Sequence, residues 1–239
     1  MNEHPKMTAP NAPFKPIDFL AREIDAERRA NGEIILRQRI PLNEYQRCIP
    51  LYLAKWAQER ADQTWLAQRR GPDRAWKRVS YAEAKRDVDA LTQALLDMKL
   101  TPEQPVAILS GNSIEHALMT QAAMQAGIPA APVSPAYSMM SQDHAKLRYI
   151  FDLIKPGVVM VQDGVVFGKA LKALDLTGVK VIHVDRAPEG IASHAWSDLV
   201  ATKRTDAVDK ALAAVGPKTV GKLLVTSGAT GMPKTVGNP

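Results

Sequence analysis

The chain has 239 residues, of which 46% are hydrophobic and 23% charged, and these proportions are those of an ordinary globular protein with a buried core. Its 31 Lys and Arg residues exceed its 25 Asp and Glu residues, which gives a formal net charge of +6. A single cysteine, Cys48, excludes an internal disulfide framework and favours a reducing, cytoplasmic location. Because no apolar run is long enough to span a bilayer, we expect no membrane partner.

The first part of the chain predicts a leader, a tight turn and a β-hairpin. Residues 1–17 contain four prolines and few apolar neighbours, so we expect a disordered leader. Residues 30–33 indicate a tight turn followed by a strand. Pro50 fits the first turn of a helix, and residues 63–68 and 76–79 indicate two strands of a hairpin.

Helix-start signals and apolar runs alternate through the rest of the chain. Ser80 with Glu83 matches a capping box, Asn112 with Glu115 gives a second one, and Ser141 is expected to cap another helix. Short apolar runs that predict strands lie at residues 106–109, 130–133, 158–161, 179–184 and 223–225. We therefore expect an α/β fold, mainly a parallel sheet with helices on both faces, preceded by the leader and the hairpin.

The last of these runs leads into a loop rich in glycine and hydroxyl side chains. Its sequence is Thr226-Ser227-Gly228-Ala229-Thr230-Gly231-Met232-Pro233-Lys234. The glycines permit positive φ angles and leave room for a bulky anion, and successive N–H groups in such a turn form an anion-binding concavity. Hydroxyl donors and a lysine ammonium add to it. We therefore predict a phosphate-binding loop that comprises Thr226, Ser227, Gly228, Ala229, Thr230, Gly231 and Lys234.

Two other interpretations compete with a phosphate-binding loop of this kind. The spacing from Gly228 to Thr235 fits a Walker loop except at Pro233, which cannot donate the N–H that the position before the lysine requires. A P-loop nucleotidase is therefore disfavoured. By composition alone, an ordinary surface loop after a strand fits as well as a phosphate site does.

The order of residues in the loop resembles the pyrophosphate-loop signature of the adenylate-forming superfamily, which includes acyl-CoA synthetases, luciferases and nonribosomal adenylation domains. Ala229 stands where that signature has Ser or Thr, and Thr235 stands where it usually has Gly. Residues 79–83 and 124–133 are similar to two earlier motifs of the superfamily. Within it, the segments that look most like feruloyl-CoA synthetases are residues 30–42, 107–116 and 133–138.

This resemblance implies a two-step ligase. A carboxylate, here an aromatic acid such as the hydroxycinnamate ferulate, would attack the α-phosphorus of ATP, and coenzyme A would then displace AMP to give a thioester. Mg²⁺ would bridge the phosphate oxygens. The loop residues would hold the β- and γ-phosphates, with Ala229 contributing only its backbone, and we assign no catalytic residue or metal ligand to this chain. The expected partner is therefore a small carboxylic acid.

Members of the superfamily are more than twice as long as this chain. On that ground we expect residues 18–239 to form an incomplete N-terminal AMP-binding domain that stops just after the phosphate loop. Such a chain is expected to be inactive alone, as a gene fragment, a frameshifted remnant or one half of a split enzyme with a separately encoded second half. The alternative is a non-catalytic remnant or an interaction module.

The distribution of charged residues leads to further expectations about partners. From residue 203 onward there are six Lys and Arg residues and two Asp residues. This surplus of positive charge would attract ATP toward the loop, and a solvated basic face is an equally good interpretation. We see no run of basic residues interleaved with aromatics, so no nucleic-acid partner is expected. None of the five histidines has the spacing of a metal site, and His116 is interpreted as an ordinary helix residue.

Overall fold

The computed structural model describes residues 21, 23–226 and 231–239, and the chain divides into two compact units, Met1–Tyr45 and Gln46–Pro239. The predicted leader, residues 1–17, lies outside the described residues.

In the first unit, strands β1 (Ile24–Arg28) and β2 (Ile34–Gln38) form an antiparallel hairpin. The expected turn at residues 30–33 is confirmed, and Gly32 adopts the positive φ angle of 85° that such a turn requires. Strand β1 was not predicted from the sequence, because three of its five residues are charged and it therefore contains no apolar run.

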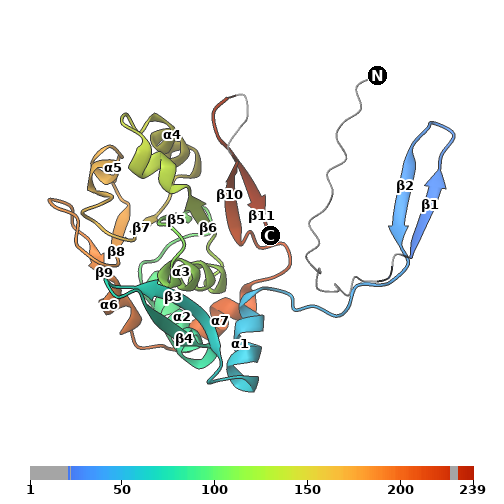
Figure 1. The fold of residues 1–239 in the computed structure, drawn as a ribbon, viewed down its shortest axis with the longest axis horizontal. Coiled ribbons are helices and arrows are strands. Elements are labelled where there is room, and N and C mark those ends of the chain that lie inside the picture. The colour runs from blue at the N-terminus through green and yellow to red at the C-terminus, as the bar shows by residue number, and fades with distance from the viewer. Residues whose placement is uncertain (1–20, 22, 227–230) are drawn as a thin grey trace, which may run out of the picture. The chain divides into compact units, whose positions relative to one another are not determined.

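The second unit contains most of the helices and strands (Figure 1). Its helices are α1 (Pro50–Glu59), α2 (Tyr81–Asp97), α3 (Ile114–Gln125), α4 (Ala145–Ile154), α5 (Gly168–Lys172), α6 (Trp196–Val200) and α7 (Ala207–Ala214), with a π-helical turn η1 (Ala136–Met140). Its strands are β3 (Thr64–Arg70), β4 (Ala75–Ser80), β5 (Val106–Leu109), β6 (Ala130–Val133), β7 (Val158–Val161), β8 (Lys180–His183), β9 (His194–Ala195), β10 (Lys222–Thr226) and β11 (Lys234–Asn238). Within the described part of the chain, no helix is both long and apolar enough to cross a bilayer.

Seven strands of this unit form one sheet in the order β11-β10-β6-β5-β7-β8-β9. Neighbouring strands from β10 to β9 run parallel, and β11 alone is antiparallel to its neighbour β10. The chain passes from β5 to β6 on one side and then crosses to β7 on the other, so the direction of winding changes at β5. Right-handed crossovers therefore put α3 and α4 on opposite faces. The expected α/β fold with helices on both faces is confirmed (Figure 1).

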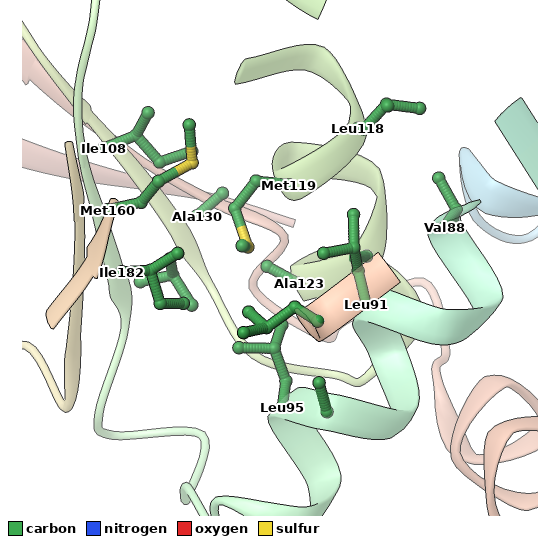
Figure 2. Packing of buried hydrophobic residues seen from close by; sticks show 14 of the residues in the cluster. Val88, Leu91, Leu95, Ile108, Leu118, Met119, Ala123, Ala130, Met160 and Ile182 are labelled. Carbon is green, nitrogen blue, oxygen red and sulfur yellow. The ribbon is translucent and has the colours of Figure 1, made fainter. Parts of the chain in front are cut away.

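A separate hydrophobic core fills each face of the sheet. On one face, Leu91 and Leu95 of α2 and Met119 of α3 pack against Ile108 and Met160 of the sheet (Figure 2). On the other face, the buried side of α4 and the short α5 pack against alternate residues of the same strands. The predicted strands read as continuous apolar runs because both of their faces are buried in this way.

The structure confirms one predicted helix cap and corrects two. Ser80 and Glu83 form the capping box at the start of α2. At α3 the cap is Ser113, whose Oγ accepts the His116 N–H over 3.0 Å, whereas the carbonyl of the neighbouring Asn112 accepts a side-chain hydrogen bond from the β3–β4 hairpin. Ser141 does not cap α4. Together with an Asp it shapes the bend after η1, so that α4 begins four residues later.

The capping box at Ser80 gives a first prediction. Hydrogen bonds from the Ser80 backbone N–H, and then from its hydroxyl, lower the pKa of Glu83 below its usual 4.5. Replacing Ser80 with Ala is expected to lower the free energy of unfolding at neutral pH by about 1 kcal/mol, measured by urea denaturation. Ser197→Ala is the control, since among the described residues that exposed hydroxyl hydrogen-bonds only to the neighbouring Asp198, and equal losses in both variants would contradict the prediction.

Candidate functional site

The predicted phosphate loop connects the antiparallel strands β10 and β11. Thr226 and Lys234 are the last paired residues of the two strands, and the Thr226 hydroxyl donates to the Lys234 carbonyl over 3.2 Å. Of the seven predicted site residues, Thr226, Gly231 and Lys234 are described, and Ser227, Gly228, Ala229 and Thr230 lie outside the described residues. The strand register therefore brings the two ends of the predicted loop together.

These loop ends lie at the carboxyl edge of the sheet. Strands β10, β6 and β5 are parallel, so Thr226 leaves the sheet at the same edge as Ser134 after β6 and Ser110 after β5. Open α/β sheets bind ligands at this edge. Both the hydroxyl-bearing Thr226 and the cationic Lys234 are exposed there. Among the described residues Lys234 forms no ion pair, so the stem presents an uncompensated positive charge and a hydroxyl to solvent.

The structure places at least two of the basic residues after position 203 away from this loop. Lys222 begins β10, and four residue steps of extended strand, about 13 Å, separate it from Thr226. Arg204 lies elsewhere, where it pairs with Asp209 and, over 3.4 Å, with Asp89 of α2. These residues are close to the loop in sequence but are directed to other parts of the unit by α7 and by the length of the strand.

A second group of polar residues at the carboxyl edge was missed by sequence reasoning. Ser110 Oγ, directly after β5, lies 2.8 Å from Nδ1 of His116 in the first turn of α3. The spacing of Ser and His across a strand-to-helix connection was the available signal. Burial, reinforced by the positive charge of Lys222, lowers the pKa of His116 below its usual 6.5, although a hydrogen bond to the Gly111 backbone opposes the shift.

Beside this pair, a hollow of about 390 Å³ opens where the direction of winding changes. It lies at the carboxyl ends of β5, β7 and β8, and its polar lining includes Arg70, Asn112, Gln162 and Asp185. A hollow of about 480 Å³ near Lys155 is larger, but it lies at the amino ends of β7 and β8, away from this edge. We therefore choose the hollow at the carboxyl edge as the candidate site because of its position on the sheet, although its volume is smaller. In the described ranges no three His, Cys, Asp or Glu residues cluster as metal ligands would.

The half-buried imidazole of His116 predicts a pH dependence of stability. His116 binds its proton less tightly in the folded chain than in the unfolded one, so lowering the pH through 6.5 favours unfolding until the lowered folded pKa is passed. Urea denaturation between about pH 7.5 and 5 is expected to show a smaller pH-dependent loss of stability in His116→Gln than in the unmodified chain. Parallel curves for the two proteins would contradict this assignment.

The comparisons with known proteins show the family and the fold. A sequence profile of the AMP-binding enzyme family matches residues 53–237, which is most of the chain. The chain belongs to this family. The predicted membership of the adenylate-forming superfamily is thus confirmed at the level of the AMP-binding enzyme family. No curated protein sequence matches the chain.

Several solved structures have a similar fold. VinN matches with a TM-score of 0.60 and 18% sequence identity, and the match covers 82% of this chain and 46% of VinN. Acetoacetyl-CoA synthetase from Streptomyces lividans matches with a TM-score of 0.60 and 19% identity, and the match covers 79% of this chain and 29% of the synthetase. A fatty acyl-adenylate ligase from L. pneumophila, solved with acyl adenylate and pyrophosphate, matches with a TM-score of 0.57 and 16% identity. The match covers 80% of this chain and 30% of the ligase. The chain spans less than half the length of each of these proteins, and at such identities the likeness concerns the fold.

Proposed function

We propose that this chain supplies the phosphate-binding part of a cytoplasmic, ATP-dependent carboxylic acid ligase. The reaction would join the acid to AMP with release of pyrophosphate and then transfer the acyl group to coenzyme A. The observation that carries the proposal is the pairing of Thr226 with Lys234 at the carboxyl edge of the sheet, at the ends of the predicted loop of an AMP-binding enzyme.

In this proposal the chain acts by positioning and by charge. The Lys234 ammonium attracts the β- and γ-phosphates and offsets the charge that develops as pyrophosphate leaves. Gly231 leaves room for the phosphates: a Cβ at that position would meet no atom of the described residues within 4 Å, and Gly231 is exposed. Mg²⁺ would be held by phosphate oxygens of ATP. We assign it no protein ligand, because the described residues contain no cluster of acidic side chains.

The acid is proposed to be an aromatic one, a hydroxycinnamate such as ferulate. Support comes from the position of two of the three segments that resemble feruloyl-CoA synthetases. Residues 107–116 run from β5 into α3, and residues 133–138 run from β6 into η1, so both cross the same edge of the sheet as the ends of the phosphate loop. Segments at this edge are in the right place to shape a ligand site.

Binding of ATP by the chain itself tests the phosphate assignment. Lys234→Ala is expected to weaken the affinity for Mg·ATP about tenfold, measured by isothermal titration calorimetry, because one charge-assisted contact to phosphate is lost. The matched control is Lys222→Ala, which removes the same charge from the other end of the same strand pair. Unchanged binding in Lys234→Ala, or an equal loss in the control, would defeat the proposal.

The complete ligation is tested separately, because the chain spans less than half of the solved enzymes it resembles. We propose that turnover needs a second polypeptide that supplies the remaining part. Release of AMP is followed with Mg·ATP, ferulate and coenzyme A, first with the chain alone and then with a co-expressed second half. Turnover by the chain alone would remove the split-enzyme proposal, and faster turnover with an aliphatic acid than with ferulate would remove the substrate assignment.

A further inference from the structure

The β3–β4 hairpin has two chemically different faces. Cross-strand partners share a face, so the pairs Arg69–Trp76 and Ala67–Arg78 lie on one side, and Gln68–Lys77 lies on the other. The side that carries Gln68 is directed to α3, where the amide oxygen of Gln68 accepts the backbone N–H of Ile114 over 3.2 Å. The opposite side, which we call the Trp76 face, is directed to solvent.

The Trp76 face presents guanidinium groups held against an exposed indole. Trp76 is 52% exposed, and the guanidinium carbons of Arg69 and Arg78 lie 4.9 and 5.8 Å from its ring centre. Trp56 also has two cations over its ring, but these are Lys55 and Arg60 of one helical segment, whereas the two guanidiniums at Trp76 come from both strands of the hairpin. Stacking fixes a guanidinium in place and leaves its N–H edge free to bind an anion in bidentate fashion.

Nothing in the described part of the chain neutralises this charge. Arg69 and Arg78, and Arg74 in the turn between the strands, are exposed, and none of them forms an ion pair with another described residue. The hairpin also corrects an expectation drawn from the sequence. Basic residues are interleaved with an aromatic here, since Trp76 lies among Arg69, Arg70, Arg74, Lys77 and Arg78.

The dimensions of the face favour an acidic polypeptide over nucleic acid. The strands of six and seven residues are only about 20 Å long, and two guanidiniums already contact the indole on which a base would stack. Arg and Trp are also the residues that most often dominate protein–protein interfaces. Arg69 and Arg78 are diagonal neighbours, about 7 to 8 Å apart, and alternate residues of an extended chain have nearly the same spacing of about 7 Å.

We propose that the Trp76 face is the docking surface for an extended acidic segment of a partner protein, with carboxylates at alternate positions that meet Arg69 and Arg78. The interaction is independent of the proposed ligase activity. It uses the free N–H edges of the two guanidiniums, which the indole of Trp76 holds in place.

The test uses a labelled peptide of alternating Glu and Thr, with binding followed by fluorescence anisotropy. The Arg69→Gln/Arg78→Gln variant is expected to bind it at least about tenfold more weakly than the unmodified chain. Lys169→Gln/Lys172→Gln is the matched control, because it removes two exposed positive charges from α5, and it is expected to change the affinity less than about twofold. A peptide with the same residues arranged in a Glu block and a Thr block should bind more weakly than the alternating one.

Three results would overturn the proposal. One is absence of binding by the unmodified chain, and another is an equal loss in the arginine and lysine variants. The third is tighter binding of an oligothymidylate, or of vesicles of phosphatidylcholine and phosphatidylserine, that depends on the same arginines. If the arginine-to-glutamine variant melts at a lower temperature, Arg69→Lys/Arg78→Lys is used in its place. This variant keeps both positive charges but lacks the planar guanidinium groups, and it is expected to bind the peptide about threefold more weakly than the unmodified chain.

Discussion

Replacing Leu91 with Ala is expected to lower the free energy of unfolding by about 3 to 4 kcal/mol. Leu91 lies on α2, is fully buried, and packs with α3 against the sheet at the centre of the larger core (Figure 2). Truncation removes apolar contacts that the rigid helices and sheet cannot restore by collapsing, so a cavity remains. Denaturation by urea, monitored by circular dichroism, measures the loss.

Leu153→Ala is the matched control for this truncation. Leu153 belongs to α4 and is 45% exposed, so removal of the same atoms is expected to cost less than about 1 kcal/mol. A loss at Leu91 no larger than that at Leu153 would mean that the core between α2, α3 and the sheet is not packed as described.

The strands of this core could be predicted from the sequence because parallel strands buried on both faces are continuous apolar runs. Residues 106–109 and 158–161 are examples, and each forms a strand with the predicted bounds. Strand β11 could not be found in this way. Its sequence, Lys-Thr-Val-Gly-Asn, has one apolar side chain, and it is a strand because the register with β10 supplies its hydrogen bonds.

The polar contacts at the carboxyl edge were harder to predict than the strands, because most of them join residues that are not part of one local sequence pattern. The glycine-rich loop has a local signature and follows an apolar run, so its start could be assigned to the end of a strand, whereas its return along β11 could not be predicted. The pairing of Ser110 with His116 has a weaker signature that depends on a strand passing into a helix at that point. The contact between Arg70 and Glu115 has none, because 45 residues separate the two and only the packing of the β3–β4 hairpin on α3 brings them together.

Replacing Arg70 with Met is expected to destabilise the chain by about 3 kcal/mol, because it leaves a buried carboxylate without its main partner. The Glu115 side chain is only 3% exposed and is paired with the Arg70 guanidinium. Lys77 also contacts this carboxylate, over 3.5 Å, but half of its side chain is exposed and it cannot replace a bound guanidinium. Thermal and urea denaturation at neutral pH measure the effect.

The double variant Arg70→Met/Glu115→Met separates the loss of packing from the exposure of an unpaired charge. Exchanging a buried ion pair for apolar side chains is often close to neutral, so the double variant is expected to lie within about 1 kcal/mol of the unmodified chain and to be more stable than Arg70→Met alone. Additive losses in the two single variants would contradict this account, since they would mean that Arg70 and Glu115 do not interact. A recovery in the double variant would show that the hairpin is attached to α3 mainly by its apolar contacts. The ion pair would then serve to orient Gln68 and the hairpin over the hollow at the carboxyl edge, where Arg70 donates to the Gln68 amide oxygen over 2.9 Å.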